Sequence, residues 1–117
     1  PSASEVKVHQ IMDQFLGEVY TKEKQADYRK QFVTFQEYLG EQSFLKGNAE
    51  ERLAILKQID GSTEAIQQTF LNLKQQTIAY YLTTEEIGKN YLNYLPIPGE
   101  YEACISLEEA GGKAWAL

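Results

Sequence analysis

Histidine and cysteine, which supply many of the nucleophiles, bases and metal ligands of proteins, occur once each in this sequence, as His9 and Cys104. A Cys–His nucleophile pair can be drawn between them, but nothing in their local sequence supports it. A lone histidine beside a glutamine and an isoleucine is typical of a surface residue. Zinc sites, iron–sulfur clusters and covalent haem all need more ligands than these two. The sequence therefore predicts no metal centre and no catalytic pair.

Two further patterns resemble functional motifs only in part. Gly111-Gly112-Lys113 lacks the glycine spacing and the following Ser or Thr of a phosphate-binding loop. Glu85-Glu86 and Glu108-Glu109 are adjacent acidic pairs, and adjacent side chains on a helix point in different directions, so neither pair shares a proton. We interpret both pairs as solvated charge at helix N-termini. The chain shows no catalytic set and no cofactor site, and we expect no enzymatic activity from it alone.

The elements around these residues are predicted to be helices, because apolar residues recur at helical spacing and no segment alternates at period two. The expected starts are a capping box at Ser2 and Glu5, Thr21, a capping box at Asn48 and Glu51, Ser62 or Thr63, and a capping box at Thr83 and Glu86. The expected stops are Gly40, Gly47 after a short segment around Phe44 and Leu45, Asp60-Gly61-Ser62, and about Tyr94. Rings at helical spacing are expected in the core, namely Phe15, Phe32, Phe35 and Phe70.

This pattern predicts an all-α fold, a small bundle of about five helices with an irregular, extended C-terminal arm. We place the bundle at residues 1–94 and the arm at 95–117, within one domain. The net charge of −6 argues against nucleic acid and against an anionic membrane surface. No apolar run reaches membrane-spanning length. The chain opens at Pro1 without a methionine, which favours a processed or trimmed product and leaves its export signal an open question.

The arm has a composition unlike that of the helices before it. Pro96 and Pro98 flank Ile97, so the backbone there must leave the helix and run extended. An extended segment rich in Tyr, Leu and Ile must lie along a groove of its own bundle or of a partner. Large rings in or beside the arm are typical of interface anchors, although packing on the parent bundle is an equally simple interpretation; these rings are Tyr91, Tyr94, Tyr101 and Trp115.

The arm and the turn before it resemble the gluconate 2-dehydrogenase subunit 3 family. The family pattern is a Thr-x-Glu-x-Gly-like turn, a tyrosine, then Pro-x-Pro-Gly-x-Tyr and a cysteine. Its places are taken here by Thr84, Glu85, Gly88, Tyr94, Pro96, Pro98, Gly99, Tyr101 and Cys104. The ending Gly112-Lys113-Ala114-Trp115 is similar to the family's usual Gly-Arg-Ala-Trp. Ala103 departs from the pattern, because glycine is frequent before the cysteine.

The resemblance implies a small subunit, itself without a cofactor, of a periplasmic flavin-dependent sugar or polyol dehydrogenase. In such complexes a large subunit holds FAD, and a cytochrome c subunit with haem c often takes the electrons. The resemblance also implies twin-arginine export and a periplasmic location, although the signal and the Asp-Thr-Pro-Gly-like segment usual ahead of the first helix are not part of this sequence. The residues carried over as candidate partner contacts are Tyr94, Pro96, Pro98, Gly99, Tyr101, Cys104 and Trp115.

Three function classes remain open from the sequence. The leading one is a non-catalytic accessory subunit that binds, stabilises and escorts a large oxidoreductase. The rival is a stand-alone helical binding protein with no flavoprotein partner, and the third, an enzyme, is disfavoured because catalytic residues are missing. We expect Cys104 to be a small buried group rather than a nucleophile. A neighbouring gene for a large flavin oxidoreductase would favour the first class over the second.

Overall fold

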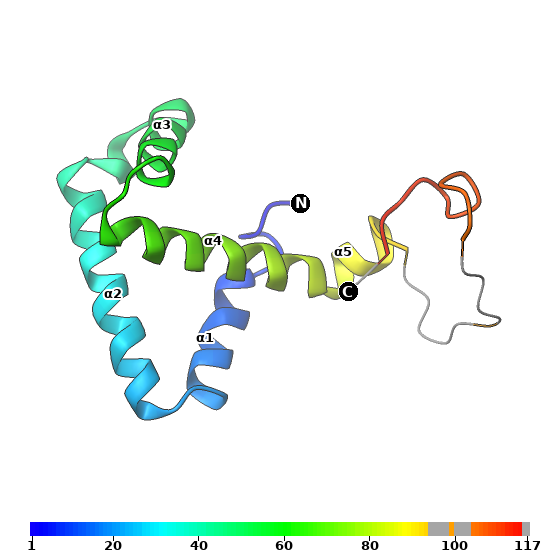
Figure 1. The fold of residues 1–117 in the computed structure, drawn as a ribbon, viewed down its shortest axis with the longest axis horizontal. Coiled ribbons are helices and arrows are strands. Elements are labelled where there is room, and N and C mark those ends of the chain that lie inside the picture. The colour runs from blue at the N-terminus through cyan, green and yellow to red at the C-terminus, as the bar shows by residue number, and fades with distance from the viewer. Residues whose placement is uncertain (94–98, 100–103, 116–117) are drawn as a thin grey trace. The chain divides into compact units, whose positions relative to one another are not determined.

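The computed structural model describes residues 1–93, 99 and 104–115 of the chain. Within these residues the secondary structure is helical, and the only strand-like feature is an isolated bridge between Asn93 and Trp115. The predicted all-α class with about five helices is confirmed (Figure 1). The helices are α1 (Val8–Glu18), α2 (Lys22–Glu41), α3 (Ala49–Asp60), α4 (Ala65–Thr83) and α5 (Glu85–Asn90), with a 3-10 helix η1 (Phe44–Lys46) between α2 and α3.

Side-chain caps fix two helix starts where the sequence predicts them. The Thr21 hydroxyl accepts a hydrogen bond from the backbone N–H of Lys24, at 3.3 Å, and α2 begins directly after it. The Asn48 side chain accepts from the N–H of Glu51 at 2.9 Å, while the Glu51 carboxylate accepts from the N–H of Asn48 at 2.8 Å. These bonds satisfy donors that have no partner inside a helix, so the capping box predicted for α3 is confirmed.

Other predicted boundaries are wrong by a few residues. Helix α4 begins at Ala65 rather than at Ser62 or Thr63, and α2 continues through Gly40 to Glu41. A glycine inside a helix costs only about 1 kcal/mol relative to alanine, so it permits a stop without imposing one. The backbone leaves the helical conformation just beyond, where Ser43 adopts a left-handed φ of 54°.

The capping box predicted at Thr83 and Glu86 does not form. The Thr83 hydroxyl instead donates to the carbonyl of Tyr80 in the preceding turn, at 2.9 Å, and Thr84 is the N-cap of α5. Backward bonding to a carbonyl is the usual competitor of capping for Ser and Thr side chains. Helix α5 ends at Asn90, earlier than predicted, and the predicted end near Tyr94 lies outside the described residues.

The chain divides into two compact units, one of residues 13–76 and one of residues 1–12 with 77–117. Helices α1 and α4 each contribute residues to both units. This division was not predicted from the sequence, and the predicted boundary between bundle and arm, at 94 and 95, falls on residues outside the described part, so it stays a prediction.

In the unit of residues 13–76, aromatic and amide side chains join the helices. The rings of Phe35 and Phe70 stack with centroids 6.5 Å apart, and Ile59 is 1% exposed. The Gln25 amide donates to the carbonyls of Leu16 and Tyr20, at 2.9 and 3.0 Å, and so closes the turn between α1 and α2. These contacts place the small core of this unit where α2, α3 and α4 contribute their apolar faces.

The core prediction is confirmed for some aromatic residues and wrong for others. Phe35 is buried and Phe70 is half-buried, as expected from their spacing. Phe15 and Phe32 are 42% and 38% exposed in this chain. Helical spacing places a ring on the apolar face, but a helix pair covers only the centre of that face, so rings at its border remain accessible.

In the unit of residues 1–12 and 77–117, the N-terminal residues pack against the second half of α4. Val8 and Ile87 are buried, each 2% exposed. The Tyr81 hydroxyl donates to the Pro1 carbonyl at 2.6 Å, and the Thr77 hydroxyl lies 3.9 Å from the sulfur of Met12. The start of the sequence is therefore held against the second half of α4.

The capping box predicted at Ser2 and Glu5 forms, but it encloses a single turn ahead of α1. The Ser2 N–H donates to the Glu5 carboxylate at 2.5 Å, and the Glu5 N–H donates to the Ser2 hydroxyl at 3.3 Å. Backbone bonds from Val8 N–H to the Ala3 carbonyl, at 2.9 Å, and from Lys7 N–H to the Ser4 carbonyl, at 3.1 Å, close the turn. This bonding pattern is a helix C-terminal cap, so α1 begins only at Val8.

The cap requires a left-handed residue at Lys7, whose φ is 57°. A Cβ makes this conformation unfavourable by about 1–2 kcal/mol, and glycine avoids the penalty at some cost in unfolded-chain entropy. We therefore expect Lys7→Gly to raise the free energy of unfolding by about 0.5–1 kcal/mol, measured by urea denaturation. The control is Lys7→Ala, which removes the same side chain and charge but keeps the Cβ. An equal gain in both variants would contradict the explanation by strain.

Candidate functional site

The described residues include three of the seven candidate partner contacts. Gly99, Cys104 and Trp115 are all exposed. Cys104 is a free, exposed cysteine, so the expectation that it is buried is wrong for the isolated chain. The other four contacts lie outside the described residues, namely Tyr94, Pro96, Pro98 and Tyr101. A role in partner binding stays a prediction for all seven.

Residues 106–112 form a capped turn. The Ser106 N–H donates to the Glu109 carboxylate at 2.8 Å, and the Glu109 N–H donates to the Ser106 hydroxyl at 3.1 Å. At the other end, the Gly112 N–H donates to the Leu107 carbonyl at 2.8 Å, with Gly111 at a φ of 73°. The two ends reproduce the pattern at residues 2–8, with glycine now at the left-handed position. The predicted irregular arm therefore contains a locally ordered turn in this segment.

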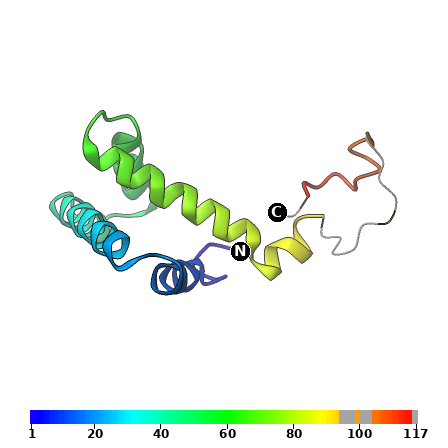
Figure 2. The ribbon, with the colours of Figure 1, turned by 60° about the horizontal axis from the view of Figure 1, so that its bottom comes forward.

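Asn93 binds the end of this capped turn. Its side-chain amide donates to the carbonyls of Ala110, at 2.5 Å, and of Lys113, at 2.8 Å. Its backbone N–H donates to the carbonyl of Ala114 at 2.6 Å, and its parallel bridge to Trp115 extends the contact. In Figures 1 and 2 the orange-to-red part of the chain accordingly returns to the yellow end of α5. We call these three hydrogen bonds the Asn93 clasp.

Large apolar side chains remain exposed around the clasp. Tyr91 is 56% exposed, Ile105 40%, Leu107 73% and Trp115 53%. Isolated exposed apolar residues are ordinary, but four large ones within the segments joined by one clasp are typical of a surface that a partner covers. Tyr and Trp are also among the residues enriched in interface anchors.

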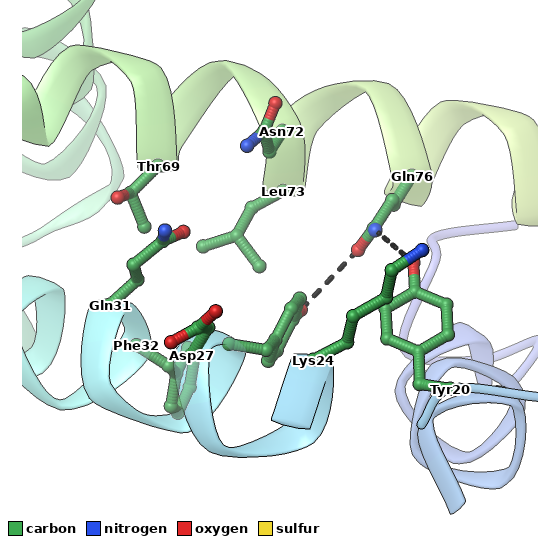
Figure 3. Close-up of a pocket in the computed structure, with 10 residues that line it drawn as sticks. Tyr20, Lys24, Asp27, Gln31, Phe32, Thr69, Asn72, Leu73 and Gln76 are labelled. Carbon is green, nitrogen blue, oxygen red and sulfur yellow. Dashed lines mark hydrogen bonds between the residues drawn. The ribbon is translucent and has the colours of Figure 1, made fainter. Parts of the chain in front are cut away.

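A hollow with a volume of about 230 Å³ lies in the unit of residues 13–76, between α2 and α4. Figure 3 shows Gln76 reaching from α4 toward Tyr20, while Gln31 of α2 points toward Thr69 of α4. The Tyr28 hydroxyl donates to the Gln76 side-chain oxygen at 3.3 Å, and the Gln76 amide nitrogen donates to the Tyr20 hydroxyl at 3.2 Å. This chain of hydrogen bonds closes one end of the hollow.

The groups around this hollow do not form a recognisable catalytic arrangement. Its charged side chains are Lys24 and Asp27, which are both exposed, and the remaining polar groups are amides and hydroxyls. Among the described residues, no buried carboxylate lines this hollow to act as a base. The geometry can accept hydrogen bonds and donate them, which is a capacity for binding.

A second, more apolar hollow has a volume of about 530 Å³ and lies where α2 meets η1. Leu45 at its edge is 83% exposed. The Arg52 guanidinium donates to the carbonyls of Phe44 and Leu45, at 3.2 and 2.8 Å, and lies over the Phe44 ring at 5.8 Å from its centroid. Arg52 of α3 therefore fixes η1 and with it one wall of this hollow.

Within residues 1–93, 99 and 104–115, no group of three or more His, Cys, Asp and Glu side chains is arranged to hold a metal ion. His9 and Cys104 are each exposed. None of the helices described is both long and apolar enough to cross a membrane.

The described part of the chain defines a small all-α protein with exposed apolar side chains gathered around the Asn93 clasp. The sequence model of the gluconate 2-dehydrogenase subunit 3 family matches residues 1–99, which is most of the chain, and the chain belongs to this family. The match includes the helical front part and ends at Gly99, so Tyr101, Cys104 and Trp115 lie beyond it. Neither a curated protein nor a solved structure matches the chain significantly.

Sequence reasoning missed the residues that organise the site. Ser106 and Glu109 carry the same Ser-x-x-Glu signature as Ser2 and Glu5, followed by glycines, so a capping box could have been predicted there. Asn93 carried no such signal, because its partners lie 17 and 20 residues further along the chain. The pairing of Tyr20 and Tyr28 with Gln76 is equally long-range.

Replacing Gln76 by methionine tests the hydrogen-bonded chain across the α2–α4 hollow. The variant keeps the length of the side chain and removes the partners of Tyr20 and Tyr28. Because both bonds are long and partly solvated, we expect a loss of about 1–2 kcal/mol in the free energy of unfolding, measured by chemical denaturation. Gln75→Met, at an exposed neighbour in α4, is the matched control and should change stability by less than about 0.5 kcal/mol. Equal effects would indicate that the hollow contributes no specific interaction.

The pKa of Glu109 is lowered from its ordinary value of 4.5, first by the hydrogen bond from the Ser106 N–H and then by the Ser106 hydroxyl. A lowered folded-state pKa means that the carboxylate stabilises the turn fully above the ordinary value, and that this contribution is lost as the pH falls through the lowered pKa. We therefore expect the capped turn to open below about pH 4.5, followed through the fluorescence of Trp115, the single tryptophan. Glu109→Gln keeps an acceptor without titrating there, so its signal should stay flat; a matching transition in both proteins would assign it to other carboxylates.

Proposed function

We propose that this chain is a non-catalytic small subunit that binds and stabilises a large flavin-dependent dehydrogenase such as gluconate 2-dehydrogenase. The observation that carries the proposal is the family membership over residues 1–99, because the family is described as a subunit of that enzyme. A subunit has partners, and the partner we propose is the large subunit that holds FAD, with a cytochrome c subunit carrying haem c as the electron acceptor. The periplasm and twin-arginine export are part of the same proposal.

The surface of the chain supports a role in binding. Exposed apolar groups lie next to the clasp, namely those of Tyr91, Ile105, Leu107 and Trp115. Exposure of apolar surface to water is unfavourable, and burial against a protein partner would remove it from water. Exposed apolar residues in the other unit, such as Val19 and Leu45, would allow a partner to make contact there as well. The groups in the described hollows favour binding over chemistry, since none combines a base with an activated nucleophile.

The increase in the large subunit's stability that binding would give follows from the binding equilibrium. A partner that binds only the folded large subunit raises that subunit's stability by about 2.7 kcal/mol when it is present at a hundred times its dissociation constant. The isolated large subunit should therefore lose flavin and melt at a lower temperature than the complex.

The test is to express the large flavin subunit with and without this chain and to measure gluconate oxidation with an artificial electron acceptor. The chain alone should show no turnover and no flavin absorption, and the complex should be active and melt at a higher temperature. Turnover by the purified chain alone would contradict the non-catalytic role. An unchanged melting temperature and yield of the large subunit would contradict the stabilising role and favour a stand-alone binding protein.

Truncation after Tyr94 separates docking from folding. It removes Ile105, Leu107 and Trp115 and leaves all five helices. We expect the shortened chain to keep its helical circular dichroism and most of its melting temperature, while it no longer co-purifies with the large subunit. The matched control is Trp115→Ala in the full chain, which should weaken the complex without unfolding the chain. Outright unfolding of the truncated chain would mean that the segment is part of the core.

A further inference from the structure

Asn93 makes contacts that join two segments distant in sequence. Its amide nitrogen gives both of its protons to backbone carbonyls, those of Ala110 and Lys113, and its backbone N–H binds a third, that of Ala114. An asparagine amide supplies two donors from one atom, which neither aspartate nor a hydroxyl residue can do. The Lys113 ammonium adds a longer contact of 3.4 Å back to the Asn90 carbonyl.

The clasp binds a segment that is already ordered locally. The carbonyl of Ala110 stands at the end of the capped turn, where a helix-like turn leaves its carbonyls without internal partners. Gly111 and Gly112, with φ of 73° and 69°, turn the chain so that the carbonyl of Lys113 meets the same amide. The local turn and the long-range clasp therefore support each other, and ordering one lowers the entropic cost of ordering the other.

Residues 104–115 carry both apolar and acidic side chains to the surface. Leu107, the most exposed of the apolar residues around the clasp, is followed directly by Glu108 and Glu109, which are also exposed. The hydrogen bonds from Ser106 lower the pKa of Glu109, so this carboxylate remains charged at neutral pH. A complementary surface must then be apolar at its centre with cationic side chains at its border.

We propose that Asn93 is a positioning residue that holds residues 104–115 as a preformed docking surface for a partner protein whose own site is apolar and bordered by Lys or Arg. The inference rests on the proposed function for the identity of the partner, the large dehydrogenase subunit. The clasp orders the segment before the partner binds, so binding loses less conformational entropy. The segment therefore binds more tightly than a free tail of the same sequence. The acidic border steers the encounter, and Leu107 and Trp115 supply the apolar contact.

The first experiment tests the clasp in the isolated chain, without any partner. Asn93→Asp removes both side-chain donors and turns a carboxylate toward two carbonyls, and Asn93→Ala removes the side chain. Both variants should increase acrylamide quenching of Trp115 and speed amide exchange of residues 104–115, with helical circular dichroism unchanged. Asn90→Asp is the matched control, because it makes the same charge change three residues earlier and keeps the carbonyl that Lys113 contacts. Equal quenching in wild type and both Asn93 variants would overturn the clasp as an organising contact.

The second experiment measures binding, with the purified large flavin subunit as the probe. Asn93→Asp and Asn93→Ala should weaken the complex about tenfold or more, and Asn90→Asp should change the affinity less than about twofold. Glu108→Gln should slow association at low salt and have little effect at high salt, as expected for a charge at the border of an interface.

The two experiments separate the possible failures. If wild type does not bind the large subunit, the proposed function fails, while the quenching data still decide the clasp. If the clasp opens in the Asn93 variants and binding is unchanged, the positioning role is wrong although the proposed function stands. If Ala and Asp at position 93 weaken binding without loosening Trp115, Asn93 acts by direct contact and the inference of preorganisation is overturned.

Discussion

A helix leaves its first four N–H groups and its last four C=O groups without hydrogen-bond partners inside the helix. In this chain, nearby side chains supply hydrogen-bond partners at several of these helix and turn ends. Thr21 caps α2, Asn48 and Glu51 cap α3, and the boxes at Ser2–Glu5 and Ser106–Glu109 each stabilise a single turn. The buried apolar side chains among the described residues are few, namely Val8, Phe35, Ile59 and Ile87. Local hydrogen bonds at the ends of elements therefore determine much of the architecture, and a large core does not.

A chain with so small a core would gain stability from burying its exposed apolar side chains against another protein. Small cores give small margins of stability, so burial against a partner contributes strongly to the stability of both. Under the function proposed above, such a contact would use the exposed rings and aliphatic groups near the clasp and those beside η1. The polar lining between α2 and α4, in contrast, is held by its own hydrogen bonds through Gln76 and needs no partner to be satisfied.

The sequence predicted those features whose two participants lie within a few residues of each other. The box of Asn48 and Glu51 and the cap of Thr21 could be found because donor and acceptor are three residues apart. At Thr83 the same signature was misleading, since the hydroxyl had a backward carbonyl within equal reach and local sequence does not decide between the two. Asn93 could not be found, because no pattern in one sequence tells which distant carbonyls an asparagine will meet. The exposure of Phe15 and Phe32 was not predicted for the same reason. The spacing of apolar residues indicates which face of a helix is apolar, but the neighbouring helix determines how much of that face is covered.

The unit that contains the clasp is assembled from both ends of the chain, and this affects the order in which the protein can form. Residues 13–76 are continuous, so their unit can fold as soon as they have been synthesised. Residues 1–12 must wait for the second half of α4, because Met12 meets Thr77 and Pro1 meets Tyr81. During synthesis residues 1–12 thus lack these contacts until the second half of α4 has been made, and they close a long loop when they bind it. Residues 1–12 therefore depend for these contacts on residues that are synthesised 65 to 80 positions later.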